Sequence, residues 1–292
     1  MTRRASTLIG FTAILSWALL ALFTAASGLV PPFQLTAMAF AIGGMVGAAS
    51  WFLRGGDRSV FRQPVAVWLL GVASLFGYHF LYFTALRSAP AAEASLIAYL
   101  WPLLIVVFSG LLPGETLRTH HVLGALIGFL GAALIITNGG SLQIKTDYVP
   151  GYLAAIVCAL IWSAYSVLSR RFGHVPSDIV TGFCLATAIL SALCHLALEE
   201  TVWPADLLQW LAVLGLGLGP VGLAFFAWDH GVKYGDIQVL GASSYAAPLL
   251  STLVLVVAGF QQANWIIATA CALITAGAVL AAKDLLFKRK RL

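Results

Sequence analysis

Ten apolar stretches, each about twenty residues long, follow one another along the chain with short connections between them. The hydrocarbon core of a bilayer is about 30 Å thick, and an α-helix needs about 20 residues to cross it. Backbone groups inside lipid must be satisfied within the spanning segment, which favours helices over an open sheet. The stretches predict an all-α integral membrane protein with ten transmembrane helices. We place these helices at residues 5–27, 33–53, 65–86, 92–112, 119–138, 149–170, 178–198, 207–231, 236–258 and 262–282.

Composition indicates that lipid is the solvent of this chain. Hydrophobic residues make up 61% of the sequence and charged residues 9%, whereas soluble domains average about 45–50% and about 25%. The first apolar run is longer than the about 7–15 residues of a signal-peptide core, so we expect a retained helix. The cysteines lie inside apolar stretches without a CxxC pair, which favours packing over metal binding or disulfides. They are Cys158, Cys184, Cys194 and Cys271.

The placement of positive charge predicts the orientation. With the N-terminus inside, every Lys and Arg except Arg87 and Lys145 falls on the cytoplasmic side, including the basic run Lys288–Arg291. The positive-inside rule then places both termini in the cytoplasm and requires an even number of spans. The net charge of +5 is explained by this orientation, so we expect membrane lipid and no nucleic acid as a partner.

The two halves of the sequence repeat. When Ser95 is placed over Gly241, Tyr99 falls on Tyr245 and Pro102 falls on Pro248. We therefore divide the chain into residues 1–146 and 147–292, with five spans each. Because five is odd, the two copies enter the membrane from opposite sides. Inverted repeats are typical of alternating-access transporters, whose site lies near the membrane midplane between the repeats.

Three of the predicted spans contain residues that weaken a helix near its middle. Proline removes a backbone donor and clashes with the carbonyl four residues earlier, so a helix kinks there. The freed polar groups are tolerated against a cavity or a neighbouring helix. We predict hinges at these residues, with a role only in packing as the alternative. The hinge residues are Pro102, Pro248, Gly217, Gly219 and Pro220.

Polar aromatic residues in the third span share one helical stripe. Tyr78, His79 and Tyr82 recur at the spacing of one helix face. A tyrosine hydroxyl at lipid depth needs a partner, so this stripe is expected to face inward. His79 is the ionisable residue nearest the bilayer centre and could bind a carboxylate or carry a proton. A neutral histidine bonded to a neighbouring helix is the alternative.

Further aromatic residues lie away from the span ends. Trp17, Trp101, Trp162, Tyr165 and Trp228 could form an aromatic cavity or simply fill the bundle. Tryptophans nearer the span ends fit a belt at the lipid headgroups.

Asp229 and His230 end the eighth span. A solvated helix end and a gate or proton site both remain open for this pair. We find no metal-ligand cluster, catalytic motif or Walker loop, so no cofactor, no metal and no enzymatic activity are expected.

The sequence resembles the ten-helix EamA-type exporters of the drug/metabolite transporter superfamily. The resemblance covers the whole chain and rests on the repeat and on Pro113-Gly114-Glu115-x-Leu117. The segments 99–102, 161–165, 227–231 and 244–248 are similar to those of exporters of aromatic amino acids. The chain departs from the family pattern at Gln261 and Gln34, which affects the subfamily and substrate more than the fold.

The resemblance implies an exporter of aromatic and other neutral amino acids in a bacterial inner membrane, active as a monomer and working by alternating access. A multidrug or metabolite exporter is the alternative, and a membrane enzyme or receptor-like scaffold is the alternative from another class. His79 and Asp229 are the candidates for proton coupling. The predicted substrate-binding residues are Tyr78, His79, Tyr82, Tyr99, Trp101, Trp162, Trp228, Ser244 and Tyr245.

Overall fold

The structure, a computed structural model, describes residues 1–142, 145–257 and 262–286. Within these ranges every regular element is a helix and no strand occurs. Nine helical segments have the length and hydropathy to cross a membrane, and a tenth apolar helix, Trp265–Ala281, has 17 residues. These segments confirm the predicted all-helical membrane fold. Gln261 and the basic residues 288–291 lie outside the described residues.

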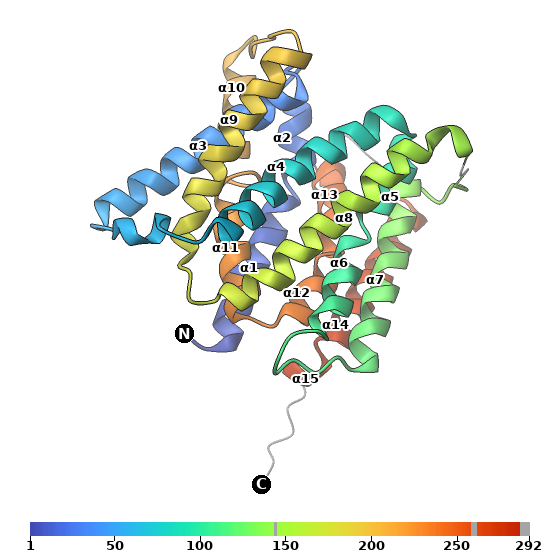
Figure 1. The fold of residues 1–292 in the computed structure, drawn as a ribbon. Helices are drawn as coiled ribbons and strands as arrows, with labels where there is room; N and C mark the ends of the chain where they lie inside the picture. The colour runs from blue at the N-terminus through green and yellow to red at the C-terminus, as the bar shows by residue number, and fades with distance from the viewer. Residues whose placement is uncertain (143–144, 258–261, 287–292) are drawn as a thin grey trace.

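The element order is shown in Figure 1. Four of the predicted spans are each formed by two shorter helices in succession. The α-helices are α1 (Arg3–Trp17), α2 (Leu20–Ala26), α3 (Pro32–Leu53), α4 (Val65–Ser88), α5 (Ala91–Ala98), α6 (Trp101–Ser109), α7 (Thr119–Thr137), α8 (Val149–Ser169), α9 (Val180–Leu198), α10 (Leu207–Leu218), α11 (Leu223–Tyr234), α12 (Ile237–Ser243), α13 (Ala246–Val257), α14 (Trp265–Ala281) and α15 (Lys283–Leu286). The 3-10 helices are η1 (Arg58–Phe61), η2 (Thr146–Tyr148), η3 (Arg170–Phe172) and η4 (Ser177–Ile179).

Two of the breaks lie at the predicted prolines. Pro102 is in the first turn of α6, and Pro248 is in the first turn of α13. A proline is tolerated in a first turn because the missing N–H would have no partner inside the helix. Each proline therefore ends one short helix and begins the next, as expected for a break and not for a smooth bend.

The break between α10 and α11 depends on glycine. Gly219 has φ −117° and ψ −105°, and Gly222 has φ −111° and ψ −91°. A Cβ on Gly222 would lie 1.7 Å from the carbonyl oxygen of Gly217. Glycine is therefore required where the eighth span turns.

The break between α1 and α2 was not predicted. It falls at Ala18 and Leu19, without proline or glycine, where the Leu19 N–H bonds to the Ser16 carbonyl in a tighter turn. The indole N–H of Trp17 donates to the carbonyl of Pro220 at 3.0 Å. The break in the first span therefore lies against the break in the eighth.

Helices from the two halves pack in pairs. The most extensive contacts join α1 to α11, α4 to α8, α3 to α9 and α7 to α14. Glycines allow two of these pairs to approach closely. A Cβ on Gly231 of α11 would lie 2.5 Å from the Gly10 Cα of α1, and one on Gly124 of α7 would lie 2.5 Å from the Gly277 carbonyl oxygen of α14. Such small-residue faces are typical of helix packing in membranes.

The start of α1 and the short helix α15 lie at one end of the bundle, which we call the termini face (Figure 1). The other end, which we call the opposite face, carries the start of α3 and the ends of α4 and α9.

Candidate functional site

A cavity of about 100 Å³ lies where the broken spans meet α4 and α8. It is smaller than the about 300–1,000 Å³ that is typical of small-molecule sites. Its lining, all of it among the described residues, contains no Asp, Glu, Lys or Arg. The lining residues are Trp17, Leu20, Tyr78, His79, Tyr99, Trp101, Trp162, Pro220, Val221, Phe225 and Ala247.

Five of the nine predicted substrate-binding residues line this cavity together. Tyr78 and His79 come from α4, Trp162 comes from α8, and Tyr99 and Trp101 flank the break between α5 and α6. The sequence stripe on the third span and the aromatic residues beside Pro102 therefore converge at one place.

The other four predicted residues lie around the lining. Tyr82 stacks on Tyr78 at 6.0 Å and its hydroxyl bonds to Ser95 at 3.1 Å. Trp228 is fully buried, 6.2 Å from Trp162. The Ser244 hydroxyl donates to the carbonyl of Leu240. The Tyr245 hydroxyl accepts from the N–H of Leu103 at 3.1 Å, which joins α6 to the break between α12 and α13.

Three tryptophans of the lining, Trp17, Trp101 and Trp162, cluster with the buried Trp228 behind them. Trp17 lies 5.1 Å from Trp228, 6.0 Å from Trp162 and 6.1 Å from Trp101, measured between ring centres. Aromatic pairs at such distances each contribute about 0.5–1.5 kcal/mol beyond the area they bury. We call Trp17, Trp101, Trp162 and Trp228 the tryptophan cluster.

The indole N–H groups of this cluster are used in two ways. Trp17 donates to Pro220 and Trp228 donates to Ser166 at 3.1 Å. The indole nitrogens of Trp101 and Trp162 have no hydrogen-bond partner among the described residues, and neither is sealed from the cavity. These two donors are therefore available to a ligand.

Trp17 also lines the cavity, and the sequence analysis named it among the aromatic residues that could form one. Leu20, Val221, Phe225 and Ala247 line the cavity as well, although the sequence analysis did not assign them to the site. Phe225 precedes Trp228 by three residues in the same span, so a stripe on that helix could have identified it. Nothing in the pattern of Leu20 or Ala247 separates them from other apolar residues.

The termini face is closed by a group of charged side chains. Glu115, in the loop before α7, pairs with Arg3 at 2.9 Å and with Arg170 at 2.6 Å. Arg3 also pairs with Asp236 at 3.3 Å, and Arg170 donates to the carbonyls of Val232 and Gly235. We call Arg3, Glu115, Arg170 and Asp236 the ionic cluster. It ties α1 and the loop before α7 to the end of α8 and the start of α12.

Asp229 lies between this cluster and the cavity and is 1% exposed. Its carboxylate accepts from Tyr165 at 3.0 Å and Ser177 at 2.6 Å, and it pairs with Lys233 at 2.7 Å. Lys233 donates in addition to the carbonyl of Val175. Asp229 is therefore not a solvated helix end, which removes that alternative.

At the opposite face, Glu199 joins three helices. Its carboxylate accepts from the N–H groups of Phe33 and Gln34 at the start of α3 and pairs with Arg87 at the end of α4. His195, one turn earlier in α9, lies 3.1 Å from the same carboxylate. An anion at a helix N-terminus is favoured by the helix dipole.

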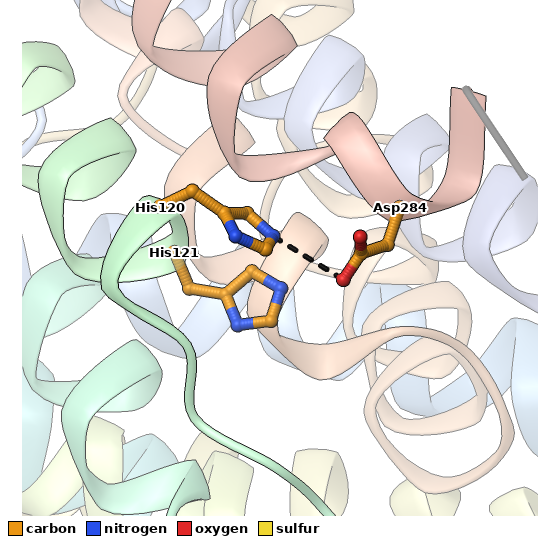
Figure 2. A group of neighbouring side chains, drawn as sticks. All are labelled: His120, His121 and Asp284. Atoms are coloured by element: carbon orange, nitrogen blue, oxygen red, sulfur yellow. Dashed lines mark ion pairs between the residues drawn. The ribbon is translucent and has the colours of Figure 1, made fainter.

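One group of side chains has the composition of a metal site. The ligand atoms of His120, His121 and Asp284 lie within 4.8 Å of one another, and Figure 2 shows both rings turned toward the carboxylate. Each side chain also has a structural partner. Asp284 pairs with Arg118 at 2.7 Å and with His120 at 3.3 Å, and His121 Nδ1 accepts from the Arg118 N–H at the start of α7. A metal would displace these contacts.

A membrane bundle of broken helices around an aromatic cavity defines this chain as a multi-pass transporter, and it belongs to the EamA-like transporter family. The sequence pattern of that family matches residues 5–137 and again residues 149–283.

Several relatives of the chain are named as exporters. The chain is 59% identical over 282 residues to the aromatic amino acid exporter YddG of Ancylobacter novellus, covering 96% of this chain and 98% of that protein. It is 26% identical to the protein of the same name in Salmonella typhimurium, covering 86% and 88%, and 31% identical to the pseudopaline exporter CntI of Pseudomonas aeruginosa, covering 68% of each. A solved crystal structure matches with a TM-score of 0.92 at 58% identity, covering 99% of this chain and 100% of its own.

Proposed function

We propose that this protein exports aromatic and other neutral amino acids from the bacterial cytoplasm. The observation that carries the proposal is the chemistry of the cavity, which presents indole and phenol rings without a charged side chain. Such walls suit a flat apolar side chain through stacking. The name of the Ancylobacter novellus relative, at 59% identity, supports the same substrate class.

The unpaired donors of the lining suit the carboxylate of an amino acid. The indole N–H groups of Trp101 and Trp162 face the cavity without a partner among the described residues. A carboxylate accepts such bonds, and hydrogen bonds to an ionised group are stronger than neutral ones. Our proposed site keeps the nine predicted residues, which are Tyr78, His79, Tyr82, Tyr99, Trp101, Trp162, Trp228, Ser244 and Tyr245. Of these, Tyr82, Trp228, Ser244 and Tyr245 lie behind the lining residues and support them.

We propose that export proceeds by alternating access between two inverted repeats. The match of one family pattern to both halves supports the repeat. The helix packing supports its symmetry. In such a repeat, α1 of the first half corresponds to α8 of the second half, and α4 corresponds to α11. Exchanging the two halves then turns the packed pair α1–α11 into the packed pair α8–α4. The pairs α3–α9 and α7–α14 each join corresponding helices, so the same exchange leaves them unchanged.

The conformation fits the outward-facing state of such a cycle. The positive-inside rule assigns the termini face, with Arg3, Arg118, Arg170 and Lys283, to the cytoplasm. The ionic cluster, the contact between Gly10 and Gly231 and the buried Asp229 all lie between the cavity and that face. Inward opening would have to separate these contacts.

Hinges at the helix breaks would allow this motion. The breaks at Pro102, at Pro248 and at Gly217, Gly219 and Pro220 surround the cavity from three spans. Short helices joined by non-helical residues at membrane depth are the arrangement by which transporters of other folds reshape a central site.

Proton coupling, where present, is proposed to involve Asp229 or His79. A proton on Asp229 would remove the charge that holds Lys233 and would weaken the bonds from Tyr165 and Ser177. These contacts join α8, η4 and α11 beside the termini face, so their loss would favour opening there.

We also propose that the monomer is the active unit, with membrane lipid as its surroundings and no nucleic-acid partner. Both halves of this chain contribute residues to the cavity lining. A second candidate function is export of another small metabolite. The similarity to the pseudopaline exporter CntI favours it, since that protein shares the family but carries a different substrate name.

Counterflow into liposomes tests the function directly. Purified protein is reconstituted with unlabelled amino acid inside, and uptake of labelled tryptophan, phenylalanine, threonine or lysine is followed with and without a pH gradient. We expect uptake of tryptophan and phenylalanine above that of lysine, because the lining has no acid to hold a second ammonium group. If no amino acid exchanges while a control transporter is active, export of another small metabolite replaces amino acid export as the proposed function.

A further inference from the structure

The His79 ring is held in one orientation by its own helix. His79 Nδ1 lies 2.7 Å from the carbonyl oxygen of Leu75, one turn earlier in α4. A carbonyl oxygen can only accept a hydrogen bond, so Nδ1 must carry the proton that is donated. In a neutral imidazole the other nitrogen, Nε2, then has a lone pair and acts as an acceptor.

The surroundings of the ring disfavour a second proton. His79 makes aromatic contacts with Phe40 at 5.2 Å, Tyr78 at 5.6 Å, Phe83 at 6.2 Å and Phe225 at 6.4 Å. Among the described residues no carboxylate pairs with this ring, and none belongs to the cavity lining. An imidazolium here would be a charge without a partner, which is costly in an apolar environment.

The Nε2 atom is available to a ligand. His79 lines the cavity, and Nε2 has no hydrogen-bond partner among the described residues and is not sealed within the protein. The tyrosine hydroxyls of the lining can donate or accept, and the indoles only donate. Nε2 of neutral His79 is therefore a side-chain atom of the lining that can accept a hydrogen bond but cannot donate one.

Two backbone acceptors near the helix breaks are closed. Ala98, whose carbonyl Pro102 leaves without its helical partner, is fully buried and outside the lining. The Pro220 carbonyl already accepts the indole N–H of Trp17. An α-ammonium group entering the cavity has three donors, and Nε2 of His79 is a lining acceptor without another bond among the described residues.

We propose that His79 Nε2 accepts a hydrogen bond from the α-ammonium group of the substrate, and that His79 therefore selects for the ammonium and not for the carboxylate. The proposal rests on the proposed transport of amino acids. It reverses the carboxylate-binding role that the sequence analysis considered for His79 and leaves the carboxylate to the indole donors of Trp101 and Trp162.

Two truncated substrates separate the possible roles of His79. 3-Phenylpropionate lacks the ammonium group of phenylalanine, and phenethylamine lacks the carboxylate. Each is measured as an inhibitor of labelled phenylalanine counterflow in the wild-type protein, in His79→Phe and in His79→Gln. The side chain introduced in His79→Phe keeps an aromatic ring in place but offers no hydrogen-bond acceptor. The side chain introduced in His79→Gln provides an acceptor oxygen.

We expect the wild-type protein to prefer phenylalanine over 3-phenylpropionate by about tenfold or more, as a lost bond to a charged group implies. His79→Phe should abolish that preference while keeping the preference over phenethylamine, and His79→Gln should restore part of it. If His79→Phe instead loses the preference for phenylalanine over phenethylamine, His79 binds the carboxylate and the proposal is wrong. An unchanged preference for the ammonium also overturns it.

Two further readouts keep the test decisive. If His79→Phe affects only the difference between tryptophan and 1-methyltryptophan, the acceptor serves the indole N–H and the proposal fails. If the variants do not fold, ¹⁵N NMR of histidine-labelled wild-type protein reports the Nδ1–H tautomer and its response to phenylalanine. A protonated Nε2, or an Nε2 signal that saturating phenylalanine leaves unchanged, contradicts the proposal. A wild-type protein without counterflow of any amino acid refutes the proposed function instead.

Discussion

At the scale of single residues, the site depends on which polar atoms are already occupied. Two indoles of the tryptophan cluster are bonded within the protein and two are free. The free ones, on Trp101 and Trp162, also provide the faces on which a ring can stack. Sequence reasoning places these residues in the site from their aromatic character. It cannot say which N–H is free, because that depends on carbonyls and hydroxyls brought up from distant helices.

Replacing Trp101 by alanine should weaken substrate binding. The change removes a stacking face and one free donor, so we expect KM for tryptophan to rise about tenfold. The Trp101→Phe variant keeps a ring but lacks the donor, so its KM for tryptophan should lie between the values of the wild type and Trp101→Ala. The measurement is counterflow at varied external tryptophan. Trp203→Ala is the control, because Trp203 is exposed and stacks only on Trp210. Equal KM values in wild type and Trp101→Ala would contradict the assignment.

At the scale of helices, four of the spans are broken into two shorter helices. Three of the four breaks contain residues that disfavour a helix interior, namely Pro102, Pro248 and Gly219 with Pro220. These could be predicted from the sequence. The break after Trp17 could not, because it has no breaker residue of its own and lies against the Pro220 carbonyl of another span.

Replacing Pro102 by alanine should slow transport without unfolding the protein. Alanine supplies an N–H that can bond to the Ala98 carbonyl and continue the helix across the break. We expect turnover to fall about fivefold and the melting temperature to stay the same or rise. Pro150→Ala is the matched control, since Pro150 lies in the first turn of α8, where the change adds no bond within the helix. Wild-type turnover in Pro102→Ala would argue against a hinge at this position.

At the scale of the whole molecule, the two ends of the bundle are held by different contacts. Glu115 links Arg3 and Arg170 from opposite halves of the chain, whereas Glu199 links α3 and α4 to α9. Charge counting along the sequence predicts which end faces the cytoplasm. Charge counting does not predict that this end is closed, because the closing contacts join residues that are far apart in the sequence. Glu115 lies more than fifty residues from both Arg3 and Arg170.

Replacing Glu115 by glutamine should loosen the termini face. The Glu115 side chain is 7% exposed, and its loss of charge leaves Arg170, which is 18% exposed, without its ion pair. We expect this loss to cost about 1–3 kcal/mol. The expected results are a lower melting temperature and faster maleimide labelling of a Ser6→Cys reporter on α1, after subtraction of labelling without the reporter.

Asp284→Asn is the control for Glu115→Gln. It breaks the pair between Arg118 and Asp284, in which both side chains are about half exposed, and exposed pairs contribute about 0–1 kcal/mol. Equal labelling of the two variants would show that the ionic cluster does not hold the face closed.

The tryptophan cluster gives the molecule an optical signal of its own. Indole rings whose centres lie 5.1–6.2 Å apart couple their near-ultraviolet transitions, so this part of the circular dichroism spectrum depends on their mutual angles. Phenylalanine absorbs little in that band, so any change on its addition would come from the protein. The rearrangement of the cavity could therefore be followed in the unmodified chain, without a label.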